Sequence, residues 1–446
     1  MQLEANAVAI GIDAAVVANH HIVVRRPDAG GPGHVLEDFV VPPTLAGMET
    51  LTKRLSQWPA SVAVAEPTSM TWLPLSVALR DAGIDLALVG NRHSARLRSA
   101  LAGKNKSDPI DASVLSRAGE FFSLEPARIP TPGELALRRA AQRRGKAIVE
   151  TNRCLRRVMS QARWAFPDVW IAFSGSRSTA LAVLRRWPHL ESLGQARVSS
   201  ITEVVAKHTR GVARVEARAQ RIRDAAQSWA RFWDGHLDLD ALEWETTELL
   251  EDLALAEARL ERASDQAQKY WERLFGDDPL LLSLPGMGPK IAPTVRAFFA
   301  NGTQFETAKE AQAFVGLNPS NWSSGQMESP SRAITKEGLP VLRLAFYQAA
   351  NVARSHDPQL ADFYRKLMVE RGHCHAKATC AVARKLVART WSTLVSGSFY
   401  EVRDLDGHAV TAHEAKIIAE SLAVPSMVRS RTRAQSAAIH RARLSR

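Results

Sequence analysis

The stretch "KNKSDPIDASVL", residues 104–115, places Asp108 and Asp111 three residues apart at the predicted start of a helix. Residues with this spacing share one face of a helix. Ser107 or Asp108 is expected to cap that helix, with Pro109 in its first turn. The two acids fit either a solvated helix start, where the helix dipole favours carboxylates, or half of a metal site that further carboxylates would complete.

The residues before this stretch alternate strand and helix patterns. Short β-branched runs at 7–13, 20–26 and 36–43 predict three strands in a meander, with "AGGPGH" (29–34) as a turn. A helix at 44–58, a strand at 61–67, a helix at 71–83, a strand at 84–90 and a further helix are predicted to follow. This order predicts an α/β domain built on a mixed sheet of the ribonuclease-H-like kind, with helical domains after it.

Four acids lie at the ends of these predicted elements. Asp13 ends the first strand and Glu66 ends the fourth, while Asp108 and Asp111 begin the later helix. Each alone is weak evidence, since Asp13 could cap a turn and Glu66 could be an exposed strand end. Phosphoryl-transfer sites need several carboxylates around hard cations such as Mg²⁺. The four together predict a catalytic site in which they bind Mg²⁺, with two ions expected and Mn²⁺ able to substitute.

Composition narrows the class of protein. The chain has 446 residues, 46% of them hydrophobic, and a formal net charge of +12. We expect no membrane span, because an uncharged apolar run of about 18 residues is absent, and no signal peptide. Three cysteines are too few and too scattered for a disulfide framework, which favours a reducing cytoplasm. The clustered positive charge predicts a nucleic-acid partner, although an arginine-rich composition alone is the alternative.

A cationic helix is predicted from about residue 132. A solvated surface helix would normally mix the two signs of charge, whereas "LRRAAQRRGKAIVETNRCLRRVM" (137–159) carries one acid. We therefore predict phosphate contacts along this helix and at a few other basic positions. The predicted nucleic-acid-binding residues are Lys104, Lys106, Arg138, Arg139, Arg143, Arg144, Lys146, Arg153, Arg156, Arg157, Lys290, Arg332 and Lys336.

The remainder of the chain is predicted to be mostly helical. Residues 212–275 suggest a helical hairpin or short coiled coil broken at "WDGHLDLD" (233–240), either an intramolecular bundle or a dimerisation arm. "LPGMGPK" (284–290) has the pattern of a helix-hairpin-helix that approaches phosphate, or of a plain helix corner.

Two further motifs lie toward the C-terminus. "GHCHAKATC" (372–380) is a single Cys/His cluster, and zinc is not expected because structural zinc sites usually combine two spaced pairs of ligands. Residues from 424 onward, with six arginines and no acid, are expected to be disordered when free and to bind nucleic acid.

These patterns divide the chain into four predicted regions. They are a catalytic domain at 1–130, a basic helix and helical or coiled-coil region at 131–275, a helical C-terminal domain at 276–402 and a basic tail at 403–446.

The motifs resemble those of a known family. "GIDAA" (11–15), "AEPTSMTW" (65–72) and "KNKSDPIDASVL" resemble the D, E and DxxD motifs of the DEDD transposases of bacterial insertion sequences of the IS110 type. Residues 284–350 resemble that family's C-terminal transposase domain. The resemblance implies a RuvC-like first domain, a composite active site, and a non-coding bridge RNA that pairs with donor and target DNA. It also implies a homo-oligomer, a dimer that forms a tetramer on DNA, and a place in the bacterial cytoplasm in association with the nucleoid. The region at about 167–275 is longer than this family usually has.

The same resemblance implies a nucleophilic serine in "NWSSGQ" (321–326), where Ser323 and Ser324 remain alternatives. A serine hydroxyl needs a base or a metal to become a good nucleophile. Its attack on DNA would leave a covalent phosphoserine. Without the resemblance, "SSG" would be read as a turn with local hydroxyl–backbone bonds.

Three functions follow from these patterns. The first is an RNA-guided transposase or recombinase that cuts and rejoins DNA. The second is a Mg²⁺-dependent junction-resolving or site-specific nuclease that uses water and the same acids. The third is a non-catalytic nucleic-acid-binding protein, against which the four intact acids argue.

Overall fold

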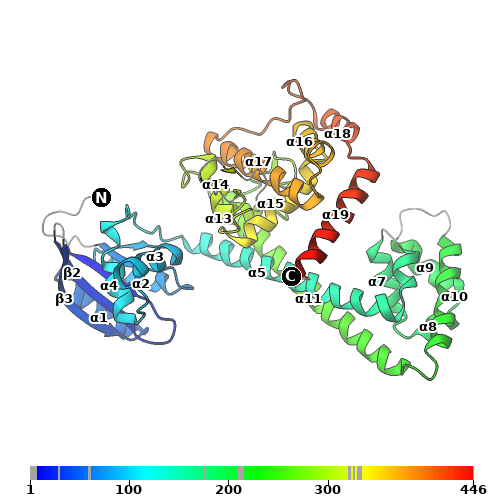
Figure 1. The fold of residues 1–446 in the computed structure, drawn as a ribbon, viewed down its shortest axis with the longest axis horizontal. Coiled ribbons are helices and arrows are strands. Elements are labelled where there is room, and N and C mark those ends of the chain that lie inside the picture. The colour runs from blue at the N-terminus through cyan, green and yellow to red at the C-terminus, as the bar shows by residue number, and fades with distance from the viewer. Residues whose placement is uncertain are drawn as a thin grey trace. The chain divides into compact units, whose positions relative to one another are not determined.

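The computed structural model describes residues 8–28, 31–58, 62–173, 176–208, 215–319, 323–324, 327–328 and 334–444. Contacts within the chain divide it into two compact units, Met1–Thr131 and Pro132–Arg446. Figure 1 shows that the first unit contains the large sheet, whereas the second is built almost entirely from helices.

Unit 1 is built on a five-stranded mixed sheet with strand order β3-β2-β1-β4-β5. The strands are β1 (Ala9–Asp13), β2 (His20–Asp28), β3 (Gly31–Val41), β4 (Val62–Ala65) and β5 (Asp85–Leu88). β1, β2 and β3 pair antiparallel as a meander, and β1, β4 and β5 pair parallel. The predicted mixed sheet with an antiparallel edge is therefore confirmed.

The third strand begins earlier than predicted, at Gly31, within the stretch expected to be a turn. Register shifts in the β2–β3 pairing, between Val24 and Arg25 and between Arg26 and Asp28, accommodate the extra residues. Gly33, with φ +65°, provides the left-handed backbone that such a bulge requires.

Helices cover both faces of this sheet. They are α1 (Leu45–Leu55), α2 (Trp72–Asp81), α3 (Asn91–Ala102), α4 (Asp108–Ser116) and the short 3₁₀ helix η1 (Ala118–Glu120). Ile10 and Ile12 belong to a core with Leu51 of α1 and Leu75 of α2, whereas Val64 packs with residues of α3 and α4. Because strand side chains alternate between faces, Gly11 and Asp13 belong to the face that α4 covers.

Unit 2 begins with the longest helical pair in the chain, α5 (Pro132–Ala165) and α11 (Leu239–Phe275). Side-chain hydrogen bonds join Arg144 to Ser264 and Gln161 to Thr246, so residue numbers rise along one helix as they fall along the other. The two helices are therefore antiparallel and lie side by side in Figure 1. In place of the helical hairpin suggested as one possibility within residues 212–275, α11 pairs with α5.

The helices between α5 and α11 form a core of their own. They are α6 (Asp168–Ala172), α7 (Arg177–Arg186), α8 (Leu190–Gln195), α9 (Val198–His208) and α10 (Val215–Trp233). Trp229 donates a hydrogen bond to the Asp168 carboxylate at 2.7 Å, and Trp233 donates one to the Ala165 carbonyl at 3.0 Å. The predicted break at 233–240 falls at the end of α10 and the start of α11. These helices pack as an intramolecular bundle with buried apolar side chains.

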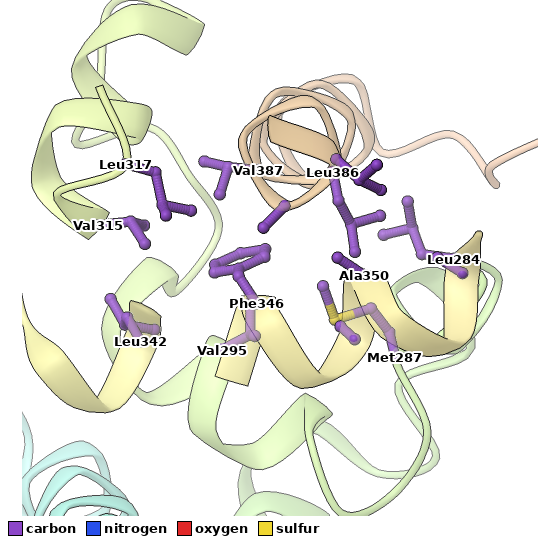
Figure 2. Close-up of a cluster of buried hydrophobic side chains, with 14 of the residues drawn as sticks. Leu284, Met287, Val295, Val315, Leu317, Leu342, Phe346, Ala350, Leu386 and Val387 are labelled. Atoms are coloured by element: carbon purple, nitrogen blue, oxygen red, sulfur yellow. The ribbon is translucent and has the colours of Figure 1, made fainter. Parts of the chain in front are cut away.

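The rest of unit 2 is a second helical body. Its elements are α12 (Pro279–Leu282), α13 (Ala292–Phe299), α14 (Ala308–Val315), β6 (Ser323–Ser324), β7 (Met327–Glu328), α15 (Pro340–Ala353), α16 (Pro358–Val369), α17 (His375–Ser396), α18 (Ala412–Ser421) and α19 (Ser426–Leu444). Phe346 of α15 lies at the centre of the core, between Val295 and Val387 (Figure 2). Of the helix-hairpin-helix predicted at 284–290, the helix on the N-terminal side, α12, is a single turn, so the segment is closer to a helix corner.

The arginine-rich tail is helical, and the prediction that it is disordered from residue 424 was wrong. Val424 is buried in the core and Val428 packs against it. Thr432, one turn further along α19, is also buried. This stripe, at helical spacing, fixes α19 on α16 and α17.

Among the described residues, no helix combines the length and apolar character that crossing a bilayer requires.

Candidate functional site

The predicted acids converge on the face of the unit 1 sheet that α4 covers. Asp13 ends β1, and Glu66 directly follows β4, which pairs parallel with β1. Asp108 and Asp111 both lie in the first turn of α4. Parallel strands bring their carboxyl ends to one edge of a sheet, which explains why Asp13 and Glu66 share this edge.

Gly11 allows α4 to lie unusually close to β1. A Cβ atom built at Gly11 would lie 1.9 Å from the carbonyl oxygen of Ala112 and 2.4 Å from the amide nitrogen of Ser116. Any residue but glycine would therefore push the helix away from the strand. The close packing brings the first turn of α4 near the end of β1.

A buried arginine fixes α4 on the sheet. Arg25 of β2 donates hydrogen bonds to the hydroxyls of Ser113 at 2.8 Å and Ser116 at 3.1 Å. Ser107 takes the N-cap position of α4 with an extended backbone but makes no side-chain cap bond, and Pro109 lies in the first turn as expected. Arg25 therefore sets the rotation of the helix and with it the direction of the two aspartates.

The four carboxylates interact electrostatically. Burial, followed by the negative charges of Asp108, Asp111 and Glu66 in that order, raises the pKa of Asp13 to about 6. His21, opposite Asp13 on β2, acts in the other direction. Negative charge is therefore concentrated around Asp13, and a bound cation would relieve it.

Two of the acids have protein partners from α3. The Arg98 guanidinium contacts both oxygens of Asp111, at 2.9 and 3.2 Å. The Ser94 hydroxyl donates a hydrogen bond to Glu66. Ser94 and Arg98 were missed by sequence reasoning, although their spacing of four residues on one helix face was the available signal.

The arrangement is more open than a cage for one ion. Among the residues that the structure describes, the groups whose ligand atoms lie within 4.8 Å of one another are His189 with Asp240 and Glu243, and Asp404 with Asp406 and His408. The four predicted acids do not form such a group. Their hard oxygen donors and surplus negative charge fit divalent ions, provided that Asp111 exchanges Arg98 for the metal.

The predicted phosphate contacts have different environments. Arg144 is buried against Ser264, and Arg138 donates to the Ala297 carbonyl at 2.9 Å. Burial makes Arg144 a structural residue, which corrects its predicted role. Arg138 is partly exposed, and its contact with phosphate stays a prediction. Arg153 pairs with Glu150 at 2.7 Å, and Arg157 lies 3.8 Å from Asp252. The exposed residues of the predicted set are Lys104, Lys106, Arg139, Arg143, Lys146, Arg153, Arg156, Arg157, Lys290 and Lys336, while Arg332 lies outside the described residues.

The two candidate serines form β6, which pairs antiparallel with β7. Ser323 is opposite Glu328, and Ser324 is opposite Met327. The positions of the two serine hydroxyls lie outside what the structure describes, as do residues 325–326 between the strands.

Carboxylates gathered beside a sheet are typical of enzymes that transfer phosphoryl groups with divalent metal ions, and comparison with known proteins makes this class specific. A DEDD transposase family model of the IS110 type matches residues 10–167, and the model of the transposase IS116/IS110/IS902 family matches residues 278–365. These matches define a DNA transposase or recombinase of an insertion sequence. The chain belongs to the IS110 family of DEDD transposases.

Individual relatives agree with this assignment. The insertion element IS110 uncharacterized 43.6 kDa protein of Streptomyces coelicolor is 25% identical, over 77% of this chain and 83% of the relative. The insertion element IS116 uncharacterized 44.8 kDa protein of Streptomyces clavuligerus is 26% identical, over 86% and 94%. A pilin gene-inverting protein of Moraxella lacunata is 28% identical over 26% of this chain and 36% of the relative. Membership in the family implies DNA as substrate and use of a divalent metal ion.

Proposed function

We propose that this transposase cuts and rejoins DNA under the guidance of a bridge RNA, with four carboxylates as metal ligands and a serine as nucleophile. The observation that carries the proposal is the placement of the motif acids, with Asp13 at the end of β1, Glu66 after the neighbouring β4 and two aspartates in the first turn of α4. Two models of the transposase family match the same chain. The similarity to a pilin gene-inverting protein supports recombination over cleavage alone, because inversion of a gene requires that cut strands be rejoined. We further propose that unit 1 has the ribonuclease-H-like, RuvC-like fold.

Asp13, Glu66, Asp108 and Asp111 would hold two Mg²⁺ ions, for which Mn²⁺ can substitute. Ions held there would polarise the scissile phosphate and stabilise the leaving oxygen. The role of the protein is to concentrate negative charge around Asp13 and to hold Asp111 with Arg98 until a metal ion replaces the guanidinium. Burial of Asp13 further limits the water that competes for its oxygens.

Ser323 or Ser324 would attack the scissile phosphate. The bond from Oγ to phosphorus forms as the bond from phosphorus to a deoxyribose oxygen breaks. The serine proton passes to a base, and the leaving oxygen takes up a proton. The phosphoserine conserves the energy of the broken bond, so rejoining to a second strand needs no nucleotide cofactor.

Nucleic-acid partners follow from the family resemblance and from the charge of the chain. A bridge RNA would pair with donor and target DNA and supply the sequence recognition, as in other RNA-guided systems. The exposed cations of α5 would then contact phosphates without reading bases. The assembly on DNA would be a tetramer of two dimers.

The acids are tested by substitution of Asp13 in the full chain with RNA, donor and target DNA supplied. Asp13→Asn should reduce recombination and strand cleavage to background, because it removes a ligand charge while preserving side-chain volume. Asp85→Asn, at the exposed start of β5, is the matched control and should retain activity. Recombination by Asp13→Asn at the unsubstituted rate would contradict the proposal, as would activity in the presence of a chelator.

The serine is tested by the covalent adduct that it would form with DNA. The single variants Ser323→Ala and Ser324→Ala are each assayed for an SDS-resistant protein–DNA adduct. The nucleophile is the serine whose substitution abolishes that adduct. Ser398→Ala, an exposed serine after α17, is the control. If a double variant still cleaves DNA without an adduct, the enzyme is a nuclease that uses water, and the serine proposal fails while the metal proposal stands.

A further inference from the structure

A groove runs between α5 and α11 of unit 2. It encloses about 490 Å³ and is lined by Arg143, Lys146 and Glu150 of α5 and by Arg259 and Arg262 of α11, with alanines of both helices between them. The small side chains leave the space open, and the long ones border it. The lining residues run from Ala140 to Glu150 and from Ala256 to Gln266, ten residue steps on each helix, which is about 15 Å at 1.5 Å per residue.

The four cations of this groove are exposed and available. Within the part of the chain that the structure describes, Arg143, Lys146, Arg259 and Arg262 are exposed, and no carboxylate forms an ion pair with them. The acid of the lining, Glu150, is already paired with Arg153 at 2.7 Å, and the hydrogen bond from Arg153 lowers its pKa. The groove therefore carries a positive charge that no internal group neutralises.

The distribution of charge along α11 supports a role for these cations. From Leu239 to Ala258 the helix has seven acids and neither lysine nor arginine, and its first cation is Arg259. A helix selected only for solubility would mix the signs of its charges along its length. From Arg259 onward cations alternate with acids, and the first two cations of the helix, Arg259 and Arg262, border the groove. Sequence reasoning missed Arg259 and Arg262 because the acids before them make the helix look balanced.

We propose that the groove between α5 and α11 binds the phosphodiester backbone of a nucleic acid. A strand in helical form places a phosphate about every 3.4 Å, so about four phosphates span the groove, equal in number to its free cations. Arginine forks suit phosphate oxygens. This inference goes beyond the proposed catalytic residues, which are the acids of unit 1 and the serines of β6, and it rests on the proposal that α5 contacts nucleic acid.

The test is equilibrium binding by the full chain in a chelator, so that no cleavage occurs. Fluorescence anisotropy would be measured between 50 and 200 mM salt with three probes of one sequence: single-stranded RNA, single-stranded DNA and duplex DNA. The test variant is Arg259→Gln with Arg262→Gln. The control is Lys269→Gln with Arg273→Gln, which removes the same charge from the same helix outside the groove. Circular dichroism would establish that both variants keep the helical content of the unsubstituted chain.

A plot of log affinity against log salt has a negative slope. In the test variant we expect this slope to become shallower, by about 1.4 for single strands or about 1.8 for duplex. At 100 mM salt its affinity should fall about tenfold or more for the probe that the groove prefers, and the control should change less. The probe with the largest difference identifies the backbone as RNA or DNA.

Equal slopes in the test and control variants for every probe would overturn the proposal. A change of oligomeric state measured by light scattering, with unchanged slopes, would also overturn it and would make the groove a protein interface. Since the measurement contains no recombination step, failure of the metal or serine proposal leaves this result interpretable, and the reverse also holds.

Discussion

Charge and burial conflict at Asp13 in unit 1. An isolated aspartate titrates near 3.8, whereas Asp13 in the folded protein has a pKa of about 6. The folded state therefore binds this proton more tightly than the unfolded state does. By linkage, stability is highest when Asp13 is protonated, falls as pH rises from about 4 to about 6, and stays lower above that range.

Without metal, we expect the free energy of unfolding of the unsubstituted chain to fall by about 1 kcal/mol between pH 4 and pH 7 through this group. This expected change in unfolding free energy is well below the free energy to which the whole pKa shift corresponds. The reason is that Asp13 is partly exposed and solvent screens its charge. Urea denaturation in chelator at a series of pH values measures it. Asp13→Asn should lose this part of the pH dependence, and Asp85→Asn should keep it. An unchanged profile in Asp13→Asn would assign the dependence to other groups.

Arg98 neutralises part of the acidic charge when no metal is bound. Arg98→Gln should lower metal-free stability by about 1–2 kcal/mol, because it leaves the half-buried Asp111 without its partner. The same variant should show a larger rise in melting temperature on addition of Mg²⁺ or Mn²⁺ than the unsubstituted chain. Arg117→Gln, which breaks a similarly exposed pair with Glu120, is the control. If both variants respond equally to metal, Arg98 does not compete with the ion.

At the level of elements, the contact between α4 and β1 determines where the acids meet. Gly11→Ala places a methyl group against the backbone of α4, which should cost about 1–3 kcal/mol or more and should separate the helix from the strand. We therefore expect loss of metal-induced stabilisation as well as lower stability. Gly90→Ala is the control, because φ at Gly90 is −60° and the nearest atom to a new Cβ is 3.9 Å away. This variant should change stability and metal-induced stabilisation little. Thermal unfolding with and without Mg²⁺ distinguishes these outcomes.

Patterns within one element were readable from the sequence, and contacts between elements were not. Alternation along β1 and the spacing of Asp108 and Asp111 are local, so the strands, the helix and the order of the acids could be predicted. The apolar stripe of α11 shows that a partner covers it but does not say which helix, so the pairing with α5 was missed. Likewise, nothing local separates buried Arg144 from exposed Arg143, because only the position of α11 distinguishes them.

At the level of the whole molecule, the described hydrophobic cores fall into separate groups. Two belong to the sheet of unit 1, one to the helices between α5 and α11, and one to the body around Phe346. No residue is shared between the cores of the two units. Each unit therefore buries its own apolar surface and has the means to unfold as its own cooperative step.

Calorimetry of the full chain should show more than one transition. Phe346→Ala should destabilise the C-terminal body by about 3–5 kcal/mol and shift a transition that Gly11→Ala leaves in place. Gly11→Ala should in turn shift the transition of unit 1 alone. A single transition that moves equally in both variants would show that the units unfold together.

The antiparallel course of α5 and α11 has a consequence for how this family can vary. A Cβ at Gly133, at the start of α5, would lie 2.8 Å from Leu274, at the end of α11, so the chain returns almost to its point of departure. The two family models match residues 10–167 and 278–365, so helices α6 to α10 lie outside both matches. An inserted segment whose two ends lie close together can be shortened, enlarged or exchanged without moving the segments on either side of it. Helices α6 to α10 are therefore the part of unit 2 in which a new binding surface can be introduced with the least disturbance to the segments that the family models match.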